Sequence, residues 1–198
     1  MKPIPEQHFS AEDSLRLIQR MISTAKQEIS DQSFNFLLWG WAAFAACIGQ
    51  FVLKVYFDYR HHYIVWLITI PCIFITIYSA RNYRKERKVK TYVNTSMSYL
   101  WAGMGISFFV MSMLFVKLGW FNCYPFFILL YGLGAFVSGK FLQFTPFIVG
   151  GIISWCLATV AVWFSFDYQA LFAAGALLFT HIIPGHLLQK THSVSSIH

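Results

Sequence analysis

Residues 63–80 read YIVWLITIPCIFITIYSA, and the next ten residues, 81–90, read RNYRKERKVK. The first stretch contains no Asp, Glu, Lys or Arg, whereas the second contains six basic residues. An uncharged apolar stretch of roughly 18 residues or more is typical of a transmembrane helix. A short segment rich in Lys and Arg beside such a helix is typical of the cytoplasmic side of a membrane. Together the two stretches predict a membrane protein and its orientation.

The rest of the chain repeats this apolar pattern. Of the 198 residues, 57% are hydrophobic and 12% are charged, whereas soluble proteins average about 25% charged residues. Runs that are apolar on every side do not fit the alternating pattern of barrel strands, and a helix satisfies its own backbone hydrogen bonds in hydrocarbon. We therefore predict an all-α, polytopic helical membrane protein. Its six transmembrane helices are expected at residues 34–53, 63–80, 99–116, 124–142, 146–166 and 168–188.

The basic loop at residues 81–90 indicates how these helices are oriented in the membrane. Its six basic residues are Arg81, Arg84, Lys85, Arg87, Lys88 and Lys90. Placing the loop in the cytoplasm places both termini there as well. Only three of the 15 Lys and Arg residues then remain on the outer side, namely Lys54, Arg60 and Lys117. The loop is also expected to contact membrane lipids through their anionic headgroups, at about 1 kcal/mol per basic residue, or a partner protein. Because the net charge of +7 follows this topology, we do not expect nucleic-acid binding.

Two cytoplasmic segments flank the six spans, residues 1–33 and 189–198. Within the first, residues 10–30 are expected to form an amphipathic helix, because apolar residues recur there at spacings of three and four. Three positions are open to this helix: on the membrane surface, beneath the bundle, or against a partner helix. The apolar stripe consists of Leu15, Ile18, Ile22, Ala25 and Ile29, and the polar side includes Arg16, Gln19, Arg20, Ser23 and Lys26.

Polar residues inside the predicted spans form the candidate site. Ionisable residues within a membrane are costly and often functional. A metal or haem site would need further ligands, and the cysteines of the spans have no spacing that supplies them. We therefore predict no metal or cofactor and expect a hydrogen-bonded histidine. The candidate site consists of Gln50, Thr180, His181 and His186.

Several residues carry predictions about helix geometry. Pro71 is expected to kink the second span, and Pro184 is expected to break or bend the last one. Cys123 is the only cysteine expected in an outer loop. Small residues four apart let helices approach closely, and such pairs are Ala42 with Ala46, Ala45 with Gly49, Ala135 with Gly139, and Ala170 with Ala174. Hydroxyl residues within the spans, including Ser107, Ser112, Thr159 and Thr180, are expected to bond to their own backbone or to a neighbouring helix.

The sequence favours a non-enzymatic role. It has no catalytic motif such as GxSxG or HExxH, and no carboxylate lies within a predicted span, where ion-coupled transporters often need one. The leading hypothesis is an interaction, regulatory or assembly partner in the membrane, with oligomerisation left open. The alternative is a small-molecule or lipid transporter, channel or binding protein with an aromatic-lined cavity. A cavity joining Gln50 and His181 to the prolines would favour the alternative, whereas dry packing around them would favour the interaction role.

Three short stretches carry a resemblance to a known family. They are SFNFLLWGW at residues 33–41, FTPFIVGG at residues 144–151 followed by Trp155, and IIPG at residues 182–185. In these stretches the chain resembles a family of uncharacterised six-helix bacterial membrane proteins of similar length, over about residues 10 to 188. The resemblance implies a location in the bacterial inner membrane. It implies no activity and no catalytic residues.

Overall fold

The computed structural model describes residues 11–86 and 92–195, and this part of the chain is built from helices without any strand. The predicted all-α class is confirmed. The π-helix η2 lies between α6 and α7, and the 3-10 helix η1 precedes α2. The elements are α1 (Ala11–Val55), η1 (His62–Ile68), α2 (Thr69–Glu86), α3 (Tyr92–Leu118), α4 (Cys123–Leu142), α5 (Thr145–Ala161), α6 (Phe166–Leu177), η2 (Leu178–Ile182) and α7 (Ile183–Ser195).

Within the described residues, five helical segments are long and apolar enough to cross a membrane. They are Ser33–Val55, His62–Asn82, Thr95–Leu118, Cys123–Leu142 and Phe166–Lys190. The fifth predicted span, 146–166, is shorter in the structure, because α5 ends at Ala161. Ser165 adopts the extended backbone conformation of an N-cap residue and starts α6. The α5 helix has 17 residues and is therefore about 26 Å long.

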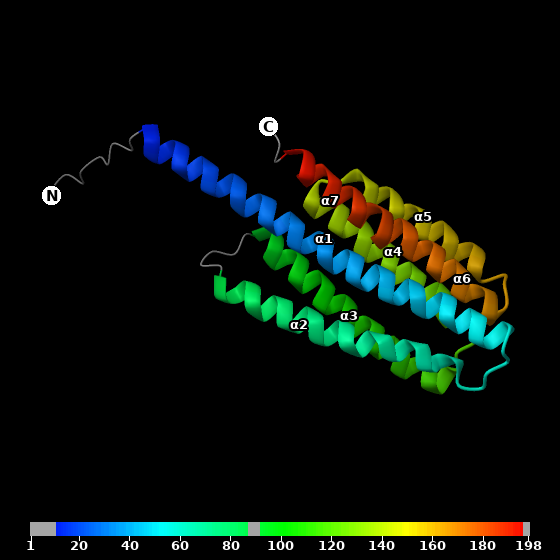
Figure 1. Cartoon of the computed structure of the whole chain (residues 1–198). Coiled ribbons are helices and arrows are strands. Elements are labelled where there is room, and N and C mark those ends of the chain that lie inside the picture. The colour runs from blue at the N-terminus through cyan, green and yellow to red at the C-terminus, as the bar shows by residue number, and fades with distance from the viewer. Residues whose placement is uncertain (1–10, 87–91, 196–198) are drawn as a thin grey trace, which may run out of the picture.

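The helices run up and down along one common direction (Figure 1). The start of α1 and the end of α7 lie at the same end of the bundle, which we call the terminal end. The connections from α1 to α2, from α3 to α4 and from α5 to α6 lie at the opposite end. The chain therefore runs the length of the bundle an even number of times from the start of α1 to the end of α7.

α1 is longer than the sequence predicts. The helix expected at residues 10–30 and the first span form one continuous helix of 45 residues. The chain has no proline or glycine between residue 11 and Gly40, so no residue there favours a break. In Figure 1 the blue N-terminal part of α1 extends beyond the other helices.

α4 and α5 pack closely because glycines lie at their contact. A Cβ atom on Gly132 would lie 2.7 Å from the indole of Trp155, and one on Gly151 would lie 2.7 Å from the carbonyl oxygen of Gly132. Ser154 and Trp155 then donate hydrogen bonds to carbonyl oxygens of α4, at 2.9 and 3.2 Å. Of the predicted small-residue pairs, Ala135 and Gly139 are both buried in this region.

Two predicted details differ from the structure. Pro71 lies in the first turn of α2, directly after η1, rather than within one continuous α-helix. Proline is tolerated in a first turn, where its missing N–H has no helical partner to lose. Cys123 is not in the loop but begins α4, and it is only 3% exposed. The predicted accessible outer thiol is therefore a buried one.

The glycine contact gives a direct test of this packing. We expect Gly151→Ala to destabilise the protein by about 1–3 kcal/mol, because the added methyl group forces α4 and α5 apart. Gly103→Ala is the matched control, since a Cβ atom on Gly103 of α3 meets nothing within 4 Å. It should leave stability unchanged or raise it by up to about 1 kcal/mol. Chemical unfolding in detergent micelles measures both, and equal effects of the two substitutions would contradict this packing.

Candidate functional site: the π-helix around His181

The last span contains a π-helix where the sequence predicts a break. The N–H group of Ile183 donates to the carbonyl oxygen of Leu178, five residues earlier. Pro184 follows, has no N–H group of its own, and would clash with a regular α-helical turn before it. The wider turn of η2 accommodates this proline inside a continuous helix. π-helical turns occur frequently at functional sites.

Two neighbouring helices approach the π-helix through glycine. A Cβ atom on Gly40 of α1 would lie 2.7 Å from the Cβ atom of His181. A Cβ atom on Gly150 of α5 would overlap the carbonyl oxygen of Phe179. The widened turn thus fits between α1 and α5 only because neither glycine carries a side chain.

His181 is enclosed by aromatic rings from three different helices. Its side chain is 1% exposed. The ring centroids of Phe36, Trp101 and Tyr131 lie 5.6, 5.5 and 5.4 Å from that of the imidazole, each in an edge-to-face arrangement. These rings belong to α1, α3 and α4, so His181 contacts most of the bundle at once. The imidazole is thus packed among side chains of the bundle.

Thr180 determines which nitrogen of His181 carries a proton. The Thr180 hydroxyl lies 2.7 Å from the carbonyl oxygen of Ala176 and 2.8 Å from Nδ1 of His181. A hydroxyl has a single hydrogen to donate, and the carbonyl oxygen can only accept. Nδ1 of His181 therefore donates its N–H to the Thr180 oxygen. In the neutral imidazole, Nε2 is then a hydrogen-bond acceptor.

The other two residues of the predicted site lie elsewhere. His186 is exposed on α7, where its ring centroid lies 6.4 Å from that of Trp41. Gln50 lies at the opposite end of the bundle and accepts a 2.6 Å hydrogen bond from the indole N–H of Trp66. The structure thus brings Thr180 and His181 together and leaves His186 and Gln50 apart from them.

Gln169 is a further buried polar residue, and the sequence did not predict it. Its side chain is fully buried at the start of α6. Its amide nitrogen lies 2.8 Å from the side-chain oxygen of Asn122 and 3.0 Å from the carbonyl oxygen of Phe164. It therefore joins the α5–α6 turn to the residue before α4. Its position near Asp167 at the predicted start of a span was a weak signal, because polar residues are common at such boundaries.

The described residues contain no group of three or more His, Cys, Asp or Glu side chains that could hold a metal ion. Their four cysteines are free, with Cys47, Cys72 and Cys123 buried and Cys156 exposed. The arrangement around His181 offers one imidazole nitrogen and aromatic surface.

The basic loop is described only in part. Arg81 is exposed near the end of α2, and Arg84 and Lys85 belong to the last turns of that helix. Arg87, Lys88 and Lys90 lie outside the described residues. Two other exposed basic side chains, Lys140 and Lys190, also occur near helix ends at the terminal end.

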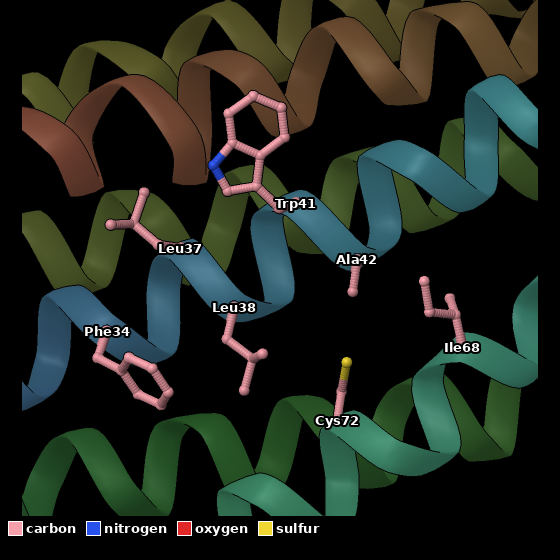
Figure 2. A pocket seen from close by; sticks show the side chains of 7 residues that line it. All are labelled: Phe34, Leu37, Leu38, Trp41, Ala42, Ile68 and Cys72. Atoms are coloured by element: carbon pink, nitrogen blue, oxygen red, sulfur yellow. The ribbon is translucent and has the colours of Figure 1, made fainter.

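An apolar groove lies between α1 and η1–α2 (Figure 2). Its volume is about 420 Å³. Neither Gln50 nor His181 lines it, so it does not connect the predicted polar residues. Its lining consists of Phe34, Leu37, Leu38, Trp41, Ala42, Ile68 and Cys72.

Comparisons with known proteins add no relative: no family model, curated protein or solved structure matches this chain.

The hydroxyl of Thr180 can be tested by a nearly isosteric change. We expect Thr180→Val to destabilise the protein by about 1–2 kcal/mol, because Nδ1 of His181 loses its buried partner. Thr180→Ser retains the hydroxyl and should cost less than half as much. Unfolding midpoints in detergent micelles compare the two variants. Equal losses would mean that packing of the methyl group, rather than the hydrogen bond, stabilises this site.

Proposed function

We propose that this chain is a non-enzymatic protein of the bacterial inner membrane that acts as an interaction, regulatory or assembly partner. The observation that carries the proposal is the extension of α1 beyond the bundle at the terminal end, where the basic last turns of α2 also lie. The chain crosses the membrane six times, with both termini in the cytoplasm. The sixth crossing is α5, whose 17 residues match the lower limit of about 17 residues for a span.

The distribution of charge supports this orientation. Exposed basic side chains at the terminal end include Arg81, Lys140 and Lys190. The opposite end combines Lys54, Arg60 and Lys117 with Asp58 and Asp167. Short loops rich in Lys and Arg are retained in the cytoplasm. The terminal end is therefore the cytoplasmic one, and its basic loop contacts anionic lipid headgroups.

The continuous α1 helix favours one of the three positions open to the amphipathic segment. Residues 11–32 add about 33 Å of helix before the first span. A helix lying on the membrane surface would have to bend sharply before crossing, and α1 has no break there. We therefore assign the apolar stripe predicted for this segment to a partner helix in the cytoplasm.

The packing of the polar residues supports interaction over transport. Gln50 and His181 each have a hydrogen-bond partner inside the protein. Both are buried, at 5% and 1% exposure. A transport pathway would need these groups to face a shared space, and the groove between α1 and α2 is lined by neither of them.

Single cysteines test the orientation. Because Cys123 is buried, the reporters are Arg60→Cys in the α1–α2 turn and Arg81→Cys near the end of α2, each combined with Cys156→Ser. A membrane-impermeant maleimide should label Arg60→Cys in intact cells and Arg81→Cys only after lysis. The reverse pattern would contradict the proposed orientation.

Two substitutions that add a negative charge to the N-terminal part of α1 test the interaction role. We expect Ile22→Glu, on the apolar stripe, to abolish the stoichiometric co-purification of a partner chain in native lipid discs. Ser23→Glu adds the same charge on the polar side and should leave that partner bound. Mass spectrometry of the discs measures both. If no partner accompanies the unmodified protein, or if both variants retain it equally, the proposed interaction is wrong.

A further inference from the structure

We propose that the groove between α1 and η1–α2 binds one acyl chain of an anionic phospholipid from the cytoplasmic leaflet, with its phosphate at the level of Arg81. This inference rests on the proposed membrane orientation and deepens it. It assigns a defined lipid site, whereas the basic loop alone would provide only general attraction to headgroups.

The groove exists because small side chains face each other. On α1, its lining residues are 34, 37, 38, 41 and 42, a spacing that forms one stripe on a helix. Ala42 and Cys72 are 7% and 5% exposed and point toward each other across it (Figure 2). Phe34 and Trp41, by contrast, are 42% and 49% exposed. The space between the two helices is therefore apolar and opens towards the surrounding lipid.

Hydrogen bonds hold the two helices at a fixed spacing. The indole N–H of Trp39 donates to the hydroxyl of Thr76 at 3.0 Å, and this hydroxyl donates to the carbonyl oxygen of Cys72 at 2.8 Å. At the opposite end, Trp66 donates to Gln50 at 2.6 Å. The groove is thus a fixed feature between two anchored points rather than a gap beside a loose helix.

Along the helix axes, the groove is only about as long as one leaflet is thick. Towards the opposite end it is closed, because η1 contacts α1 directly: a Cβ atom on Gly49 would lie 3.3 Å from Val65. From Ala42 back to Phe34 the α1 helix rises about 12 Å. One leaflet of the hydrocarbon core is about 15 Å thick, half of the full core. A partner helix would need a surface across both leaflets, whereas an acyl chain fits this depth.

The position of Arg81 indicates that the lipid headgroup is anionic. From Cys72 to Arg81 the α2 helix rises about 13.5 Å, so Arg81 lies at about the same depth as Phe34. Arg81 is exposed, and Arg84 and Lys85 follow it in the same helix. A ligand that is apolar along the groove and anionic at its end matches this arrangement. Among membrane components, an anionic phospholipid has these two properties.

Native mass spectrometry of the full chain in detergent micelles tests the site. The probes are phosphatidylglycerol and phosphatidylcholine with identical acyl chains. We expect one retained phosphatidylglycerol per chain. Ala42→Phe places a bulky ring in the groove opposite Cys72 and should lower this retention by about tenfold. Ala45→Phe is the matched control, because Ala45 is exposed one turn further along α1 and does not line the groove. It should change retention less than twofold.

The headgroup is tested separately. Arg81→Gln should lower the preference for phosphatidylglycerol over phosphatidylcholine by about fivefold and leave the retention of phosphatidylcholine unchanged. One outcome is that Arg81→Gln lowers this preference while Ala42→Phe and Ala45→Phe change lipid retention equally. That result would support contact between Arg81 and the headgroup, but it would overturn the acyl-chain site in the groove. Equal retention of the two lipids by the unmodified protein would overturn the anionic selection, whatever the orientation found by cysteine labelling.

Fluorescence quenching of Trp41 tests the same site without the Ala42→Phe variant, which is needed if that variant does not fold. Phosphatidylglycerol brominated along its acyl chains should quench the fluorescence of Trp41, which lines the groove. The contribution of Trp41 is the difference between the unmodified protein and Trp41→Phe. An unquenched Trp41 at saturating lipid would overturn the proposal. So would the loss of a bound protein chain, instead of lipid, in Ala42→Phe.

Discussion

In hydrocarbon, every backbone polar group needs a partner within the protein, and this constraint governs the structure. It makes the chain helical over the described residues. It also favours local hydrogen bonds for side-chain hydroxyls, because a hydroxyl without a partner is costly there. Five hydroxyls donate to the carbonyl oxygen four residues earlier on their own helix, those of Thr76, Ser107, Ser112, Thr159 and Thr180.

The same constraint explains the π-helix. Pro184 removes one backbone donor from the last span, and the widened turn redistributes the remaining hydrogen bonds. Such a turn is broader than an α-helical one, so its neighbours must leave room. Gly40 and Gly150 do so. His181 is thereby directed into the bundle, where Thr180 satisfies its Nδ1 atom. A proline, two glycines and a threonine together produce one buried histidine.

The sequence predicted the features that depend on composition and local spacing. It predicted the helical class, the hydroxyl bonds of residues such as Ser107 and Thr159, and the irregularity near Pro184. It did not predict the ring of aromatic side chains around His181, because Trp101 and Tyr131 lie on other helices and their meeting depends on tertiary packing. The end of α5 and the continuity of α1 were also missed, since the boundaries of apolar stretches do not specify where a helix starts or stops.

Hydrogen exchange in lipid discs tests the membrane claim most directly. Few residues of α2 and α3 are buried inside the protein, at 6% and 11% of their apolar windows, against 39% for α4. If lipid surrounds the bundle, backbone amides in the middle of α2 and α3 exchange as slowly as those of α4. Rapid exchange in α2 and α3, as expected for exposed helices in water, would contradict it.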